Sequence, residues 1–164
     1  MSTLKPVIAP CLWFDSEAEP AAKFYTSVFP NSRIRKISHY TDTGYDVHGK
    51  AAGSVLTVEF ELDGQTFTAL NGGPQFKFSE SVSFQVFCDT QDDIDYYWRA
   101  LSTDGREGVC GWLTDRYGLS WQIVPTVLPD MLTAADRARV DRVLKALMGM
   151  SKCDLAKLQQ AYAA

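Results

Sequence analysis

Two stretches of the chain share one order of hydrophobic and polar positions. In residues 6–29 and 81–102, a short apolar run leads into Asp, a hydroxyl residue and, three positions after it, an acid. Apolar residues at spacings of three and four follow, and this spacing predicts a helix with one buried side. The apolar run before it predicts a strand. The expected buried helix positions are Ala18, Ala21, Ala22, Tyr25, Val28 and Phe29, then Ile94, Tyr97, Trp98 and Leu101.

The start of the second predicted helix carries a recognisable cap. Asp89, Thr90 and Asp93 come close to the capping-box pattern, with Asp in place of the usual Glu. In the first stretch, Asp15, Ser16 and Glu19 occupy the same positions. We therefore expect both helices to begin in the same way.

More strand candidates follow each helix. They are residues 33–40, 54–62, 65–71, 108–113 and 120–125. Asp63-Gly64 suits a two-residue hairpin turn, residues 115–118 suit a second turn, and the glycine-rich residues 41–53 suit a loop. The chain therefore has the order βαβββ twice, with the second copy shortened.

Beyond Pro125 the pattern becomes helical. The expected apolar face of a long helix comprises Val140, Val143, Leu144, Leu147 and Met148. Asp154 is typical of a cap for a last short helix, whose apolar residues are Leu155, Leu158 and Tyr162. The predicted fold class is α+β, with βαβββ modules at about residues 4–73 and 80–126. These modules form a domain spanning 1–127, and 128–164 form a helical tail that packs on the sheets or on a second subunit.

Composition excludes some partners. The 164 residues are 46% hydrophobic and 22% charged, as in ordinary globular proteins. A net charge of −4 with scattered basic residues argues against nucleic acid, because phosphate binding needs a clustered basic surface. No signal-peptide pattern or membrane-length apolar run is present. We expect a cytoplasmic protein whose four cysteines are buried reduced thiols.

Three segments resemble one known family. Residues 10–34, PCLWFDSEAEPAAKFYTSVFPNSRI, residues 70–84, LNGGPQFKFSESVSF, and residues 110–125, CGWLTDRYGLSWQIVP, are similar to the PhnB-like proteins. That family, also called 3-demethylubiquinone-9 3-methyltransferase-like, belongs to the vicinal oxygen chelate superfamily with glyoxalases, dioxygenases and bleomycin- and fosfomycin-resistance proteins. The resemblance implies paired βαβββ modules, a mixed sheet curled into a glyoxalase-like cup, and a homodimer.

The resemblance also implies where a metal would bind. Metal-using relatives have the pattern Asp-x-x-Gly-His-x-x-Glu in the last strand, and Asp115, Gly118 and Gln122 match its spacing. Gln122 thus stands where the relatives place a metal-binding Glu. An amide oxygen is neutral and a weaker ligand for hard divalent ions than a carboxylate.

The other implied ligand positions depart further from the metal-using pattern. Ser81 stands where a His is expected, residues 8–10 offer no ligating side chain, and Asn71 is the best candidate in the first module. His39 and His48 lie in a strand end and a polar loop. We therefore expect no tightly bound metal and no cofactor.

The methyltransferase name has no support in the residues. Typical nucleotide-like methyl-donor sites use a glycine-rich turn between a strand and a helix in a parallel sheet. Residues 71–74, NGGP, lead instead into QFKFSES, which is not a helix start.

Strand alternation predicts the wall of the cup. Val82, Phe84, Val86 and Cys88 share the face expected to meet the helix, which turns the alternate residues toward the ligand. The expected ligand-binding residues are Asn71, Ser83, Gln85, Phe87, Trp112 and Gln122. For Gln122, a hydrogen bond between strands and metal ligation remain alternatives. For Trp112 and Trp121, core packing is the alternative.

The residues favour a metal-free protein that binds a small molecule. Few polar groups among apolar walls are typical of such sites. An enzyme acting on a small substrate, with or without a weakly held metal, is one alternative, although no nucleophile or serine elbow is evident. A dimeric interaction module without a ligand is another.

Overall fold

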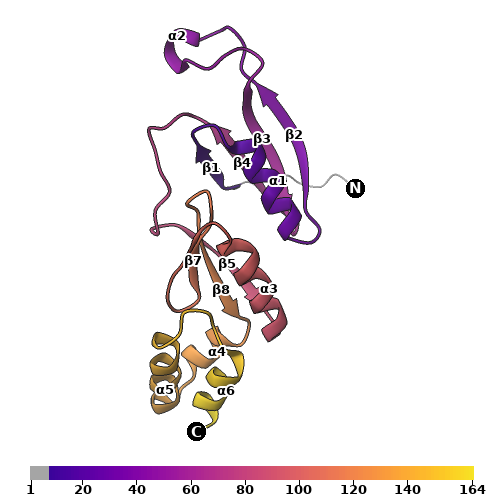
Figure 1. Cartoon of the computed structure of the whole chain (residues 1–164). Helices are drawn as coiled ribbons and strands as arrows, with labels where there is room; N and C mark the ends of the chain where they lie inside the picture. Colours follow the sequence, from indigo (N-terminus) through magenta and orange to yellow (C-terminus); the bar gives the residue numbers. More distant parts are fainter. Residues whose placement is uncertain (1–7) are drawn as a thin grey trace. The chain divides into compact units, whose positions relative to one another are not determined.

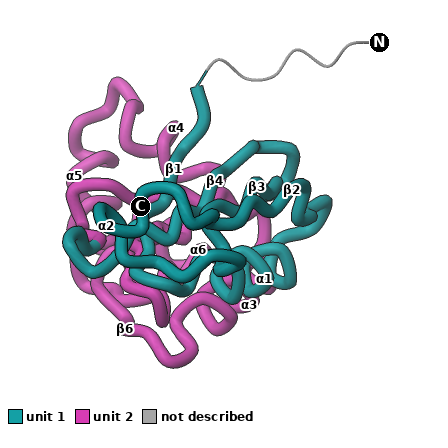
Figure 2. The backbone as a smooth tube through the Cα atoms, turned by 90° about the horizontal axis from the view of Figure 1, so that it is seen from above, with its two compact units in different colours: residues 1–77 teal, residues 78–164 magenta. Residues whose placement is uncertain are grey.

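The computed structural model of the chain describes residues 8–164. Its contacts divide the chain into two compact units, residues 1–77 and residues 78–164. Figure 2 shows the first unit in teal and the second in magenta. The predicted helical tail, residues 128–164, falls within the second unit. Its separation from a domain that ends at residue 127 stays a prediction.

The first unit is one βαβββ module. Its elements are β1 (Cys11–Phe14), α1 (Ala18–Val28), β2 (Arg33–His39), α2 (Tyr45–His48), β3 (Val55–Leu62) and β4 (Gln65–Asn71). The sheet order is β1-β4-β3-β2, with β1 parallel to β4 and the other pairs antiparallel. Asp63 and Gly64 have φ of 44° and 82°, so they form the predicted hairpin turn. Residues 41–53 form the expected loop, with the single helical turn α2 inside it.

The second unit repeats the module and adds the tail (Figure 1). Its elements are β5 (Ser83–Cys88), α3 (Gln91–Ser102), β6 (Arg106–Glu107), β7 (Trp112–Thr114), β8 (Ser120–Pro125), α4 (Leu128–Thr133), α5 (Arg137–Met148) and α6 (Leu155–Ala163). The sheet order is β5-β8-β7-β6, which repeats the order of the first sheet strand for strand. The predicted fold class, two βαβββ modules with C-terminal helices, is confirmed.

The second module differs from its prediction at two strands. It has the short strand β6, which the sequence pattern did not show. The strand expected at 108–113 is limited to β7, because Cys110 and Gly111 have positive φ values of 56° and 81°. These two residues donate backbone hydrogen bonds to Met150 and Ser151 of the tail instead of extending the strand.

The two module helices bury the predicted faces but begin differently. Ile94, Trp98 and Leu101 of α3 are buried, and Thr90 and Asp93 form the predicted capping box. The corresponding box in the first module is absent, because α1 starts after Glu17 without a side-chain cap of its own. The first helical N–H, of Ala18, instead donates to Asn71 Oδ1 at 2.8 Å.

The tail packs against the second sheet through one hydrophobic cluster. The cluster comprises Val124, Leu128, Met131, Val143, Leu147, Cys153 and Leu158. Asp154 caps α6 as predicted, by accepting a hydrogen bond from Lys157 N. The tail was expected to pack on the sheets or on a second subunit. One side of α5 packs on the sheet of the same chain. No helix within residues 8–164 is long and apolar enough to cross a lipid bilayer.

Candidate functional site

Five of the six predicted ligand-binding residues lie on one face of the second sheet. The register pairs Gln85 with Gln122, and Gln122 with Trp112, so these three residues form one row across β5, β8 and β7. Cross-strand neighbours on one face have Cβ atoms about 5 Å apart. Ser83 and Phe87 flank Gln85 on the same face of β5 because side chains alternate along a strand.

The opposite face of this sheet packs on α3. Val86, Cys88, Leu113, Trp121 and Ile123 are buried there. Trp98 of α3 also donates its indole N–H to Glu107 Oε1 at 2.8 Å. Val82 does not belong to this core, because it precedes β5 and is 64% exposed.

We call the other side the polar face. Its members are Ser83, Gln85, Phe87, Arg106, Trp112, Thr114, Ser120, Gln122 and Val124. Phe87 is 54% exposed and Trp112 is half-buried, whereas Ser120 is fully buried. Four of these members, Arg106, Thr114, Ser120 and Val124, were not among the predicted site residues. The alternation that selected Gln122 would also have selected Ser120, two residues earlier on the same strand.

Gln122 is tied to its neighbour on β5. Its Nε2 donates to Ser83 Oγ at 2.8 Å, which realises the strand-to-strand bond expected as one alternative. The amide oxygen of Gln122 and the hydroxyl proton of Ser83 remain available on the polar face. The bond therefore orients both side chains and leaves each with one group for a ligand.

A pocket of about 520 Å³ lies at the β6–β7 end of the second sheet. Its walls are formed by Glu80, Arg106, Glu107, Gly108, Val109, Trp112, Leu113 and Thr114. Trp112 thus belongs both to the row of Gln85, Gln122 and Trp112 and to this pocket. The volume is within the range of small-molecule sites.

Asn71, the sixth predicted residue, lies in the first unit and holds that unit together. Its amide accepts from Ala18 N at 2.8 Å and donates to Val55 O at 3.0 Å. Its backbone oxygen accepts from the Tyr40 hydroxyl at 2.6 Å. Asn71 is 6% exposed. Its binding of a ligand stays a prediction, while its contacts join α1, β3 and β4 and reach Tyr40, the residue after β2.

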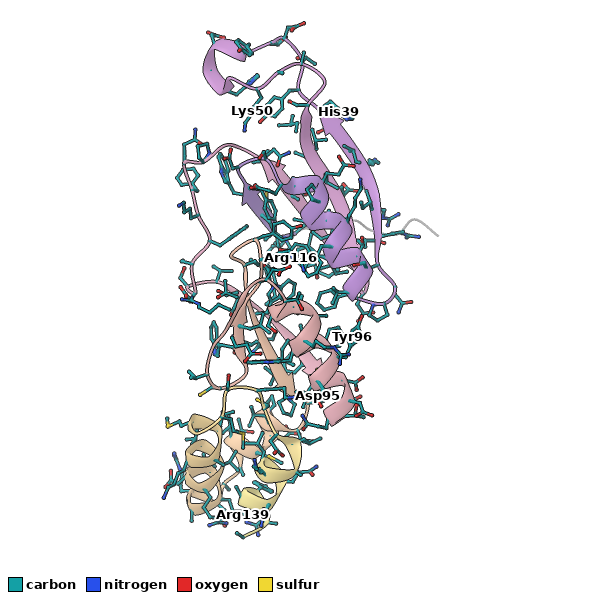
Figure 3. The ribbon with its side chains drawn as sticks, in the orientation of Figure 1. His39, Lys50, Asp95, Tyr96, Arg116 and Arg139 are labelled. Carbon is teal, nitrogen blue, oxygen red and sulfur yellow. The ribbon has the colours of Figure 1, made fainter. Side chains whose placement is uncertain are left out.

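The side chains present do not fit a resident metal ion. Within residues 8–164, no three His, Cys, Asp or Glu side chains lie together so that they could hold one. His48 accepts from Lys50 N through Nδ1 and contacts Thr43 O through Nε2, so both ring nitrogens are engaged. His39 is exposed at the end of β2 (Figure 3). No step of chemistry is therefore assigned to a metal here.

Glu61 is a buried acid with two basic partners. It is 9% exposed on β3 and bonded to both Arg33 and Arg35. Burial alone would raise the pKa of Glu61, but the two guanidinium groups outweigh it and hold that pKa below its usual value. The carboxylate therefore stays ionised and is unsuited to donate a proton.

Two of the four thiols are buried, Cys110 is half-buried and Cys11 is exposed. Cys88 and Cys153 are buried as expected, and burial raises their pKa to about 12 and about 11. Cys11 is exposed, contrary to the expectation, yet partial burial of its sulfur raises its pKa as well. Thiols with raised pKa values carry little thiolate at neutral pH and are poor nucleophiles.

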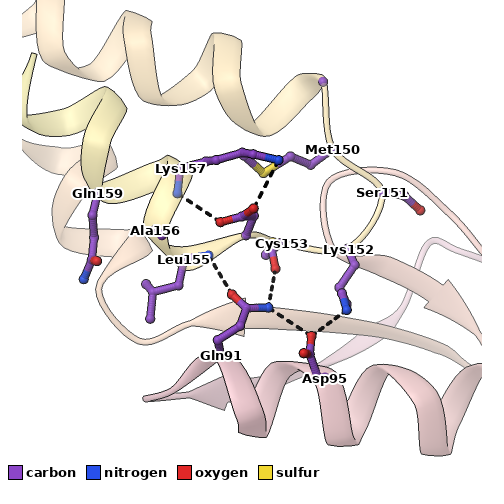
Figure 4. Close-up of a pocket in the computed structure, with 12 residues that line it drawn as sticks. Gln91, Asp95, Met150, Ser151, Lys152, Cys153, Leu155, Ala156, Lys157 and Gln159 are labelled. Carbon is purple, nitrogen blue, oxygen red and sulfur yellow. Dashed lines mark hydrogen bonds and ion pairs between the residues drawn. The ribbon is translucent and has the colours of Figure 1, made fainter.

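A second pocket, of about 590 Å³, joins the tail to α3 (Figure 4). Most of its polar side chains are already engaged with one another. Gln91 bonds to Leu155 N, to Cys153 O and to Asp95, and Asp95 pairs with Lys152 at 2.5 Å. The hydrogen bond from Lys152 holds the pKa of Asp95 below its usual value. This pocket is therefore a structural junction rather than a ligand site.

The fold is that of the glyoxalase-like proteins. Fosfomycin resistance protein FosX from Mesorhizobium loti has 14% sequence identity and a TM-score of 0.54, with 80% of this chain and 100% of that chain covered. Protein PA1353 from Pseudomonas aeruginosa has 14% identity and a TM-score of 0.58, with 74% and 98% covered. At these identities the likeness shows the fold alone.

The family follows from closer matches. The sequence profile of the 3-demethylubiquinone-9 3-methyltransferase family matches residues 6–124. The PhnB protein from Bacillus cereus has 33% identity and a TM-score of 0.65, with 73% of this chain and 99% of that chain covered. The chain belongs to the PhnB-like 3-demethylubiquinone-9 3-methyltransferase family. Among curated proteins, none matches the sequence.

Proposed function

We propose that this protein binds a small molecule on the polar face of its second sheet, without a resident metal. The row Gln85–Gln122–Trp112 is the observation that carries the proposal. It sets two amides beside an indole ring, and the row continues into a pocket of about 520 Å³. A few oriented polar groups beside aromatic surface are typical of small-molecule sites.

The polar groups of the row suit a ligand that exchanges hydrogen bonds. Because Gln122 Nε2 is held by Ser83, its Oε1 accepts from the ligand, and the exposed Gln85 amide both donates and accepts. Trp112 supplies a flat apolar wall, and Phe87 supplies a second one. The similarity to FosX, a fosfomycin resistance protein, agrees with small-molecule binding as the use of this fold.

Ligand-observed and protein-observed NMR of the full chain against a fragment set tests this function. We expect bound fragments to perturb the Trp112 indole and the Gln85 and Gln122 side-chain amides. Trp112→Ala should weaken binding about tenfold, since base- and ring-stacking contacts of this kind contribute about 1 kcal/mol or more. Tyr96→Ala, an exposed aromatic of α3 in the same unit, is the matched control. Fragments that bind only elsewhere, or none that bind, would refute the proposal.

A homodimer is the proposed assembly. Val140, Leu144 and Met148 lie four residues apart along α5, beside the buried pair Val143 and Leu147. Val140 and Leu144 are half-exposed, and Met148 is 72% exposed. A second copy that packs the same stripe against this one would cover it by two-fold symmetry, the commonest arrangement for soluble oligomers.

A further inference from the structure

A second row of the polar face consists of hydroxyl groups and one guanidinium. The register pairs Arg106 with Thr114, Thr114 with Ser120, and Ser120 with Ser83. The row therefore crosses all four strands, β6, β7, β8 and β5, next to the row of Gln85, Gln122 and Trp112. Its three hydroxyls lead from β5, at one edge of the sheet, to Arg106 on β6 at the other edge.

The hydroxyl protons of this row have no acceptor within residues 8–164. Ser120 is 1% exposed, and its Oγ has no hydrogen-bond partner there. Ser83 Oγ accepts from Gln122 Nε2, so its own proton is not used in that bond. A buried hydroxyl without a partner is costly, and natural proteins usually avoid it. The row thus offers hydroxyl donors to a hydrogen-bond acceptor on a ligand.

Arg106 can change partners at low cost. Its Nη2 donates to Glu80 Oε1 at 2.9 Å, and the two side chains are 71% and 64% exposed. Ion pairs this exposed contribute little to stability, so a ligand anion can displace Glu80. Both residues line the pocket of about 520 Å³, which also contains Thr114 and Trp112.

We propose that the ligand of the polar face carries an anionic oxygen group, a carboxylate or a phosphate, that binds along Ser83, Ser120, Thr114 and Arg106. The inference rests on the proposed function and names the chemical class of its ligand. Thr114 and Arg106 line the pocket and meet the anion there, with Arg106 pairing with it in place of Glu80. The buried hydroxyl of Ser120 and that of Ser83 donate once the anion displaces the side chains that cover them, and the apolar body of the ligand lies over Trp112. Charge-assisted hydrogen bonds of this kind are about twice as strong as neutral ones.

The positive charge in the row of hydroxyls and Arg106 disfavours a cationic ligand. Hydroxyls and amides can serve either charge, but the only charged member of the row is the guanidinium of Arg106. An ammonium group would be repelled by Arg106 and would have to compete with it for Glu80. Glu107 also lines the pocket, but its carboxylate accepts from the indole N–H of Trp98 and is thereby engaged on the α3 side.

Isothermal titration of the full chain with 2-naphthoate and with the neutral 2-naphthamide tests the inference. The two probes share the ring that Trp112 would hold and differ in the anion. We expect naphthoate to bind about tenfold more tightly, and its affinity to fall as salt rises. Inorganic phosphate, which has no ring, should compete with naphthoate at higher concentration.

Two charge variants should act in opposite directions. Arg106→Gln should weaken naphthoate about tenfold and leave naphthamide unchanged, because it removes the cation. Glu80→Gln should strengthen naphthoate a few-fold, because it frees Arg106 from its partner. Arg139→Gln, on α5 of the tail, is the matched control for loss of one arginine, and we expect it to change neither probe.

Ser120→Ala separates ligand binding from a structural contribution. It should weaken naphthoate several-fold while the melting temperature of the ligand-free protein stays the same or rises, since Ser120 Oγ makes no bond within residues 8–164. A fall in melting temperature would assign the hydroxyl to the fold and overturn its assignment to the ligand.

The outcomes distinguish this inference from the function on which it rests. Equal affinities for naphthoate and naphthamide, with perturbation at Trp112, would overturn the anionic ligand and leave small-molecule binding intact. Naphthoate binding that is insensitive to both Arg106→Gln and Ser120→Ala would also overturn it. If neither probe binds, the inference fails, while the fragment screen alone decides the proposed function.

Discussion

Gln122 connects the sheet and the proposed ligand through one amide. Its Nε2 is bonded to Ser83, and its strand neighbours are Gln85 on one side and Trp112 on the other. A carboxylate at this position could not donate to Ser83, and it would place a charge beside an indole ring. The neutral amide is therefore the residue that satisfies this row without a cation.

Changing Gln122 to Glu should cost about 1–2 kcal/mol of unfolding free energy, because it places a charge without a cation at a half-buried position, although Ser83 can donate its own proton to the carboxylate. Urea unfolding with and without Mn²⁺ or Zn²⁺ measures this. The exposed Gln160→Glu is the control and should stay within about 0.5 kcal/mol. Marked stabilisation of Gln122→Glu by metal would mean that further ligands converge on this position, against the metal-free site.

Asp115 holds the turn between β7 and β8 by accepting three hydrogen bonds. Its Oδ1 accepts from Tyr117 N at 2.8 Å and Leu119 N at 3.1 Å, and Oδ2 accepts from the Trp121 indole at 2.8 Å. The residue that matches the family pattern thus orients the strand that carries Gln122. It also explains why Trp121 belongs to the core rather than to the ligand site.

Asp115→Asn should destabilise the protein by about 1–3 kcal/mol, because the amide nitrogen would face the indole N–H and two donors would meet. Thermal or urea unfolding measures the loss, and near-ultraviolet circular dichroism reports the environment of the tryptophans. Asp46→Asn, at an exposed position in α2, is the control. Equal stability of the two variants would contradict the assignment of Asp115 to the turn.

The start of α1 depends on a residue that is distant in the sequence. Asn71 at the end of β4 accepts from Ala18 N, so the cap of this helix comes from the sheet below it. The same amide donates to Val55 O at the start of β3. One side chain therefore aligns a helix with two strands.

Asn71→Ala should cost about 2 kcal/mol of unfolding free energy, since it leaves two buried backbone groups without partners. Hydrogen exchange of the Ala18 amide provides a local measurement, and it should speed up in the variant. The exchange of Ile94, at the start of α3 with its own capping box, is the internal reference. An unchanged Ala18 rate would show that the helix start does not depend on Asn71.

The attachment of α6 should weaken in acid. The backbone N–H of Lys157 lowers the pKa of Asp154, and the hydrogen bond from Lys152 lowers that of Asp95. Carboxylates with lowered pKa values in the folded state stabilise the fold above their unfolded-state pKa, and this contribution is lost as pH falls through the folded-state pKa. The stability of the tail should thus fall as pH drops below the ordinary range of Asp.

Unfolding measured from pH 7 to pH 3 tests this attachment. The double variant Asp95→Asn, Asp154→Asn should be less stable at pH 7 and should lose less stability on acidification than the unchanged chain. Two parallel pH profiles would show that these carboxylates do not account for the acid sensitivity.

Local patterns predicted the elements that local interactions form. The strands 65–71 and 120–125 were predicted to the residue, because clear turn residues bound them, and the capping box at Thr90 lies within four residues of sequence. The first helix cap was missed because Asn71 lies 53 positions from Ala18. The start of the predicted strand at 108–113 was wrong, because Cys110 and Gly111 bond to Met150 and Ser151 of the tail.

In the candidate site too, the sequence predicted what local patterns determine and not what distant packing determines. Alternation identified the correct residues of β5, β7 and β8 for one face, since a period of two assigns faces once one buried residue is known. It could not show that Arg106 joins this face, because β6 has only two residues and no pattern of its own. Nor could it show that Ser120 is buried without a partner, which depends on packing.

At the scale of the whole molecule, the tail helix α5 has two apolar stripes with different consequences. Val143 and Leu147 belong to the cluster that includes Val124 of β8, so they join the tail to the second sheet. Val140, Leu144 and Met148 lie outside that cluster, four residues apart. The apolar face that the sequence predicts as one surface is therefore divided between the core of the chain and a surface that is free to meet a second copy.

The division makes the homodimer testable with matched variants. The unchanged chain should sediment as a dimer at micromolar concentration. Val140→Asp combined with Leu144→Asp should yield a monomer with an unchanged circular dichroism spectrum, because these half-exposed side chains lie outside the buried cluster. Leu147→Asp should instead destabilise the tail by several kcal/mol, because it places a charge in a buried cluster without a partner. A monomeric unchanged chain, or a double variant that remains dimeric, would remove α5 as the interface.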